Sequence, residues 1–122
     1  MTYSDKLIVT KQACPFEKWQ TYFPRMEDYT PENCDAAKNI FDRLISQLAE
    51  LGEAVPKSEK EKLFESAVLA LNELNEATGG GLIETGEREE LCELLDTISM
   101  AAGLNPEDYA DGEGIADEWR EW

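Results

Sequence analysis

The stretch that decides the fold is residues 58–78, which read SEKEKLFESAVLALNELNEAT. Its apolar side chains recur at spacings of three and four, the period of one helical face; they are Leu63, Phe64, Ala67, Val68, Leu71 and Leu74. Leu69 falls outside this face, among polar residues. Ser58 and Glu61 have the spacing of a capping box, which satisfies backbone N–H groups of the first turn. We therefore predict a central helix that begins at Ser58 and whose wide apolar face is covered by other elements.

Two neighbouring segments show the same helical period. Thr30 followed by Pro31 is typical of a helix start and Gly52 of a helix end, so the sequence predicts a helix over residues 32–51. A third helix is predicted over residues 87–102, where leucine and isoleucine recur at helical spacing. The connection between the first two helices is short, which favours an antiparallel hairpin.

The N-terminal part, residues 1–31, is predicted to form an arm and a short helix. Residues 6–10 can be a strand or an extended arm, and because one strand cannot make a sheet we favour an arm packed on the helices. A short helix is predicted after Pro15. Its aromatic side chains either join the core or form a surface patch for a partner; they are Phe16, Trp19, Tyr22 and Phe23.

The acidic C-terminal segment, residues 106–122, is expected to contain one helical turn after Asn105 and a final short helix. That final helix packs against the bundle through Ile115, Trp119 and Trp122, and either tryptophan can belong to the core or to an interface. Together these segments predict an all-α fold. We expect a single-domain helical bundle over residues 1–122, with three main amphipathic helices and shorter N-terminal and C-terminal ones.

The composition excludes several classes of function. The chain of 122 residues has 27 acidic and 11 basic side chains, a formal net charge of −16, and no histidine. Without histidine, the commonest general base and the usual nitrogen ligand of transition metals are missing. Cys14, Cys34 and Cys92 form no CxxC pair, so we expect free thiols and no zinc site. We predict no catalytic residue, no cofactor and no metal ion.

Two glycine-containing stretches suggest alternative sites. Residues 107–118 can be aligned with a calcium loop through Asp111, Gly112 and Glu118, but Tyr109 then stands where an oxygen ligand is expected. Glycines 79–81 lack the lysine and serine that follow the glycines of a phosphate loop. The alternatives to a binding module are therefore carboxylate-based cation binding and an unrecognised enzymatic activity.

The net charge also bears on partners and location. A strongly negative field repels nucleic acid and anionic membranes, so we expect no direct nucleic-acid binding and no membrane binding. No apolar run approaches the roughly 18 residues of a membrane-spanning helix, and residues 1–12 lack the apolar core of a signal peptide. We expect a cytoplasmic protein that is a monomer or a small homo-oligomer.

Most of the negative charge lies in the last third of the chain. Residues 84–122 contain 13 acidic and two basic side chains, which gives −11 of the total −16. One interpretation is that the acidity only keeps the chain soluble. Because an even spread would serve solubility equally well, the uneven distribution favours steering toward a basic protein partner.

We place the partner site on the third predicted helix and the C-terminal segment, where carboxylates lie beside apolar side chains that can anchor a partner. The helical period puts Glu89, Glu93 and Asp96 in one row opposite the leucines. The full set is Glu89, Glu90, Glu93, Asp96, Met100, Asp117, Glu118 and Trp122. In character, though in no sequence motif, this acidic helical chain is similar to immunity proteins that block basic nuclease toxins, to other inhibitors, and to protein mimics of nucleic acid. The resemblance implies a non-catalytic module with a basic partner.

Overall fold

Helices form the regular secondary structure of the computed structural model, which describes residues 2–21, 30–80, 82–83 and 85–122. No strand occurs within these ranges, and the predicted all-α class is confirmed. The α-helices are α1 (Tyr3–Val9), α2 (Phe16–Gln20), α3 (Pro31–Leu51), α4 (Lys57–Ala77) and α5 (Thr85–Ala101). The 3₁₀ helices are η1 (Thr10–Ala13), η2 (Pro106–Asp108), η3 (Ala110–Gly112) and η4 (Ile115–Glu118).

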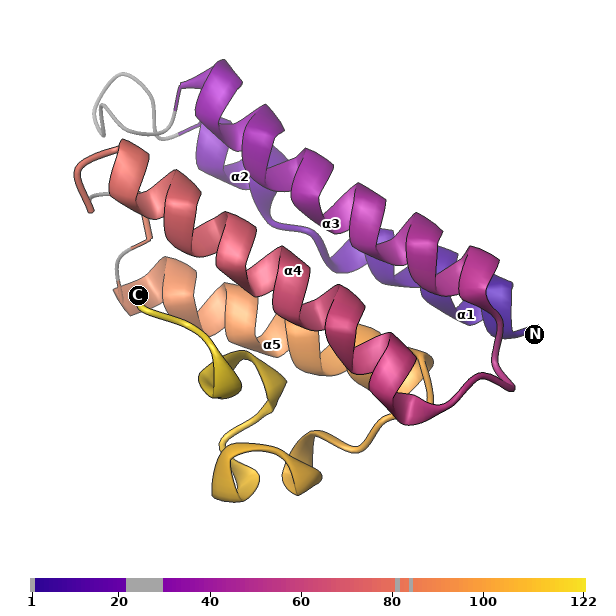
Figure 1. Ribbon diagram of the computed structural model, residues 1–122. Helices are drawn as coiled ribbons and strands as arrows, with labels where there is room; N and C mark the ends of the chain where they lie inside the picture. The colour runs from indigo at the N-terminus through magenta and orange to yellow at the C-terminus, as the bar shows by residue number, and fades with distance from the viewer. Residues whose placement is uncertain (1, 22–29, 81, 84) are drawn as a thin grey trace.

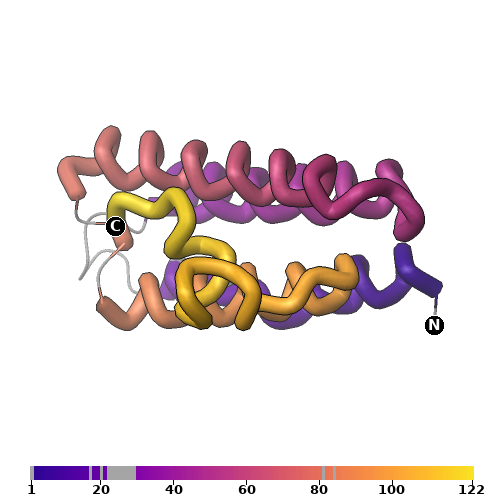
Figure 2. Tube along the Cα trace, turned by 60° about the horizontal axis from the view of Figure 1, so that its bottom comes forward, coloured from indigo at the N-terminus to yellow at the C-terminus, as the bar shows by residue number. Residues whose placement is uncertain are grey.

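The long helices α3 and α4 form an antiparallel hairpin, as their short connection predicts (Figure 1). On the other side of the bundle, α1 and η1 contact α5 (Figure 2). The C-terminal segment, residues 106–122, runs back along the bundle beside α4 and α5, and η4 contacts both helices. The N-terminal elements therefore pack against both α3 and α5, while the C-terminal segment covers one side of α4 and α5.

The start of α3 agrees with the sequence, whereas the start of α4 does not. The Thr30 hydroxyl accepts a 3.1 Å hydrogen bond from the Asn33 N–H at the beginning of α3. The capping box predicted for Ser58 and Glu61 is wrong, because α4 begins one residue earlier with Pro56 at its N-cap position and no side-chain cap. Proline cannot donate a backbone hydrogen bond, and it marks the boundary in place of the serine.

The expectation of an extended arm at residues 6–10 is also wrong. The chain forms helix α1 there because Thr2 and Asp5 make a true capping box, with the Asp5 N–H donating to the Thr2 hydroxyl at 3.1 Å. So short a helix is marginal by itself. Burial of Leu7, which is fully enclosed by the core, stabilises it.

The aromatic residues of α2 belong to the core. Phe16 and Trp19 are buried, with their rings edge to face and centroids 5.2 Å apart, and the Phe16 ring lies 5.5 Å from that of Phe41 on α3. Residues 22–29 lie outside the described residues, so the predicted roles of Tyr22 and Phe23 remain predictions.

The core follows the predicted helical faces closely. Leu71 on α4 is fully buried, whereas Leu69, which the periodicity places outside the face, is 44% exposed. Buried side chains from the three long helices meet in this core, among them Phe41, Leu44, Leu48, Phe64, Val68, Leu91, Leu95 and Ile98. Helix α5 ends before Gly103, which has a φ of +86° that suits glycine.

A buried lysine contacts three separate parts of the chain. Lys60 of α4 is only 4% exposed, and its ammonium group donates to the carbonyl of Ala102 at 2.7 Å and to that of Glu53 at 3.0 Å. The same nitrogen lies 5.1 Å from the centroid of the Tyr3 ring. The sequence gives no sign of this burial, because a lysine in the first turns of a helix is ordinarily solvated.

The final helix predicted for the C-terminal segment is a 3₁₀ helix, η4, and Trp119 and Trp122 follow it in the chain. Both tryptophans are half-buried against the core. Of the helices in the described part of the chain, none has the length and apolar composition needed to cross a membrane.

Leu71→Ala is expected to lower the free energy of unfolding by about 2–5 kcal/mol, because truncating a fully buried leucine leaves a cavity. Leu69→Ala is the matched control, the same substitution on the same helix at an exposed side chain, and should change stability by less than about 0.5 kcal/mol. Urea unfolding of both variants measures the difference. Equal losses would show that the core has been assigned to the wrong face of α4.

Lys60→Met is expected to destabilise the fold by about 2–3 kcal/mol, because the buried Ala102 carbonyl and the part-buried Glu53 carbonyl lose a charged donor. Lys62→Met, two residues along at an exposed side chain, is the control and should be nearly neutral. Chemical unfolding again gives both values. If Lys60→Met were as stable as the control, the free energy lost by removing the ammonium group from water would equal the stabilisation from its hydrogen bonds. Lys60 would then make no net contribution to stability.

Candidate functional site

The C-terminal segment is fastened to α4 by polar contacts. The side chain of Asn72 donates to the Trp119 carbonyl at 3.0 Å and accepts from the Glu121 N–H at 2.9 Å. Asn72 is therefore buried, although the periodicity of α4 places it on the polar face. The Tyr109 hydroxyl donates to the Glu61 carboxylate, and burial together with this carboxylate raises the pKa of Tyr109 to about 12. The predicted solvent face of α4 is in part an internal contact surface.

Asp96 of α5 lies beneath the same segment and is not part of an open acidic row. Its carboxylate accepts a hydrogen bond from the Ile115 N–H. A Cβ atom added to Gly114 would lie 2.8 Å from the carboxylate, so this position requires glycine both for contact and for its φ of +110°. The expectation that Asp96 points away from the protein beside Glu89 and Glu93 is corrected, because a distant part of the chain covers it.

Three other predicted site carboxylates also make internal contacts. Glu90 forms a 2.7 Å ion pair with Lys18, which connects α5 to α2. Asp117 pairs with Arg120, and Glu118 accepts a 2.6 Å hydrogen bond from the Ala110 N–H. These groups help to hold the fold, which reduces their availability to a partner.

Trp122 packs against the core and is half-buried. The Arg120 guanidinium lies 5.6 Å from the centroid of its ring. The indole nitrogen is buried, and among the described residues it has no hydrogen-bond partner. The role predicted for Trp122 in partner binding stays a prediction.

Glu89, Glu93 and Met100 are the exposed members of the predicted site on α5, and Met100 is 59% exposed. Helical spacing of four and seven residues places these three along one line of α5, which we name the α5 crest. Asp96 falls on the same line by its spacing, but the C-terminal segment covers it there. The crest also borders a groove that the sequence does not predict.

This α1–α5 groove has a volume of about 670 Å³. It is defined by Lys6, Val9, Thr10, Gln12, Ala13, Thr97, Met100 and Ala101. Val9 is 41% exposed, so the groove contains two large apolar side chains, Val9 and Met100, that the fold leaves in contact with solvent. A neighbouring depression of about 180 Å³ shares Ala13 and Thr97 with the groove and includes Glu93.

Side chains of opposite charge line this surface. Lys6 lines the groove itself, whereas Glu93 lines the adjoining depression. Sequence reasoning missed the contribution of α1, because Ile8 and Val9 suggest a strand. The Thr2–Asp5 capping box was the available signal, since it predicts a helix that buries Leu7 and exposes its β-branched neighbours.

The cysteines do not offer an activated nucleophile. Burial, and secondarily the carboxylate of Asp42, raises the pKa of Cys14 to about 11. Burial, followed by the effect of Asp35, raises the pKa of Cys34 to about 11. Burial also raises the pKa of Cys92. The reactive form is the thiolate, so these thiols are protonated and weakly nucleophilic at neutral pH.

The acidic loop in the C-terminal segment is organised by its own backbone. Within the described ranges, no group of three or more carboxylates, thiols or imidazoles is placed to hold a metal ion. Ala110 and Asp111 have φ angles of 51° and 55°, and the bond from the Ala110 N–H to Glu118 holds this turn. Glu118, aligned with the last position of a calcium loop, thus supports the turn itself.

No family model, curated protein or solved structure with which the chain was compared matches it.

Asp96→Asn is expected to raise stability at neutral pH. The pKa of Asp96 is raised above 3.8, first by burial and further by Asp117, while the bond from Ile115 lowers it in part. The folded state therefore keeps this proton to higher pH than the unfolded chain, and the free energy of unfolding falls as pH rises between the two pKa values. Asparagine does not ionise and can still accept the Ile115 bond.

Unfolding midpoints from about pH 7 down toward pH 4 measure this effect. The advantage of Asp96→Asn over the parent should shrink as pH falls toward the ordinary carboxyl pKa. Glu93→Gln, which removes an exposed charge from the same helix, controls for the general relief of repulsion. A gain independent of pH, or one equal to that of the control, would contradict the role given to burial.

Proposed function

We propose that this protein is a non-catalytic acidic interaction module whose partner is a basic protein, and that the partner binds at the α1–α5 groove and the α5 crest. The main support is that Val9 and Met100 are exposed in one groove, with Glu93 beside it. Exposed apolar surface bordered by charge is typical of protein interaction sites. The general character is that of an immunity protein, an inhibitor or a nucleic-acid mimic.

The shape and charge of the groove suit an amphipathic partner helix. Such a helix lays its apolar side chains into a groove between two helices, here against Val9 and Met100. Basic side chains at one end of it would meet Glu93 and Glu89, while the end near Lys6 suits neutral or acidic residues. In this proposal the two charges favour one orientation of the partner helix.

Carboxylates elsewhere on the surface act at longer range. Exposed acidic side chains of the C-terminal segment include Glu107, Asp108, Asp111, Glu113 and Glu121. Charges outside a contact mainly raise the rate of association, whereas buried anchors slow dissociation. In this proposal the protein acts in the cytoplasm, as a monomer or small homo-oligomer, without binding nucleic acid directly.

The test compares two pairs of charge reversals in a pull-down from a lysate of the source cells, followed by binding kinetics with the captured protein. Glu89→Lys with Glu93→Lys changes the α5 crest, and Glu107→Lys with Glu113→Lys makes the same charge change on the C-terminal segment. The parent should retain a basic protein that salt releases. The crest pair should slow its association markedly and flatten the salt dependence, while the matched pair should have a smaller effect.

Met100→Lys completes the comparison by testing the apolar contact, and it should speed dissociation. If both charge-reversal pairs slowed association equally, the net charge of the protein would explain the binding, and the α5 crest would have no special role. Loss only from the C-terminal pair would move the site to that segment. Capture of no protein, together with turnover of a small molecule in an activity screen, would overturn the proposed function in favour of an enzyme.

A further inference from the structure

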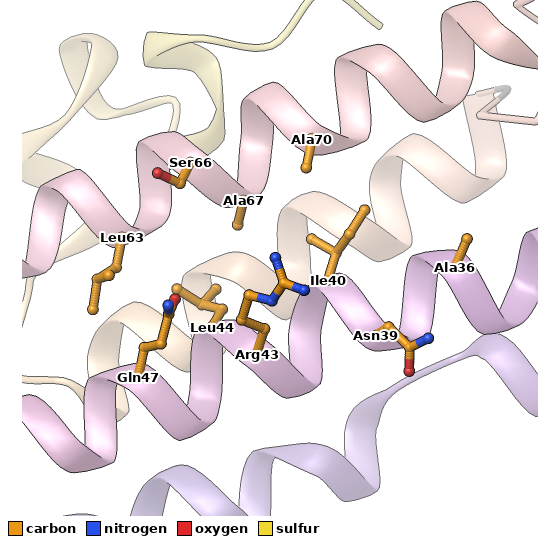
Figure 3. A pocket seen from close by; sticks show the side chains of 10 residues that line it. All are labelled: Ala36, Asn39, Ile40, Arg43, Leu44, Gln47, Leu63, Ser66, Ala67 and Ala70. Atoms are coloured by element: carbon orange, nitrogen blue, oxygen red, sulfur yellow. The ribbon is translucent and has the colours of Figure 1, made fainter.

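A pocket of about 230 Å³ lies between α3 and α4 (Figure 3). Its floor is apolar and includes Ile40 and Leu44 from α3 and Leu63 and Ala67 from α4. The pocket exists because three of the four α4 residues that line it are small, namely Ser66, Ala67 and Ala70, and the fourth is Leu63. Close-packed helices leave such space only where no larger side chain fills it.

The rim of the pocket carries polar side chains that form no hydrogen bond or ion pair with the described residues. Asn39, Arg43 and Gln47 follow one another at spacings of four on α3, so they share one face, and the Arg43 guanidinium extends into the space between the helices (Figure 3). The ion pairs among the described residues are Lys18–Glu90, Lys62–Glu59 and Arg120–Asp117, and none involves Arg43. Among the described residues, this guanidinium therefore has no carboxylate partner.

We propose that this pocket binds a small amphiphilic monocarboxylate, with its carboxylate on the Arg43 guanidinium and its apolar chain on the floor. A guanidinium matches the planar carboxylate with two parallel hydrogen bonds. The amide of Gln47, which also extends from α3 toward α4, can donate to the same oxygens (Figure 3). The floor formed by Leu44, Leu63 and Ala67 offers only apolar contact, which suits a hydrocarbon chain.

Size and charge narrow the class of ligand. The volume is below the roughly 300–1,000 Å³ of pockets for drug-sized molecules, so the ligand is a short chain. A protein with a net charge of −16 repels a doubly charged phosphate more strongly than a singly charged carboxylate. One guanidinium is therefore better able to offset the repulsion of a carboxylate. The C-terminal segment, with its many carboxylates, lies along α4 and α5 and not along this opening between α3 and α4.

Three probes of equal chain length test the proposal: hexanoate, hexan-1-ol and hexylamine, followed by NMR shifts of the α3 and α4 backbone. The field of the whole protein favours the cationic amine. The pocket should instead bind hexanoate about tenfold more tightly than hexan-1-ol, since a charge-assisted contact is gained. Hexylamine binding as tightly as hexanoate at these resonances would overturn the proposal.

Variants identify the group responsible. Arg43→Gln should remove the preference for hexanoate over hexan-1-ol, while Lys38→Gln, which removes an exposed positive charge from the same helix, should preserve it. Ala70→Leu fills the pocket and should weaken both probes, whatever their charge. Retention of the hexanoate preference in Arg43→Gln, or its equal loss in Lys38→Gln, would rule out recognition by Arg43.

Discussion

The ammonium group of Lys60 is the constraint on which the arrangement of the elements depends. It donates to the Ala102 carbonyl at the end of α5 and to the Glu53 carbonyl in the connection between α3 and α4, and it lies over the Tyr3 ring of α1. A buried charge without partners is strongly destabilising. Here the partners are backbone carbonyls, and the negative end of the α5 dipole adds to their effect. Because the C-terminal segment begins at Pro106, shortly after Ala102, the position of that segment depends on the same contact.

The helical core could be predicted, whereas the polar contacts that set the position of the chain ends could not. Leu71 and Phe64 repeat at a spacing that burial of a helical face requires, and this signal is local. Lys60 and Asn72 are ordinary solvent-facing residue types on the same helix. They are buried only because Ala102 and Trp119, 42 and 47 residues away, come to rest against them. A periodic pattern contains no information about so distant a contact.

The candidate site also contains residues that local helical geometry places correctly and residues whose positions depend on distant parts of the chain. Helical geometry alone places Glu89, Glu93 and Met100 on one crest of α5, and the structure agrees. The same geometry places Asp96 on that crest, where Gly114 and Ile115 in fact cover it. The other wall of the groove was missed because β-branched Ile8 and Val9 favour a strand. The local capping bonds of Thr2 and Asp5 and the burial of Leu7 outweigh that preference.

Charge acts at two ranges in this molecule, so its two proposed sites are compatible. At physiological salt, the field of exposed charges is screened beyond about 8 Å. The acidic surface of α5 and the C-terminal segment therefore influences chiefly what approaches that side of the bundle. Among the residues that line the pocket between α3 and α4, the charged group is the Arg43 guanidinium, and contact with it dominates over more distant carboxylates. A net charge of −16 thus bears on how the protein would meet the large basic partner that we propose, but it does not determine which small molecule an individual pocket would accept.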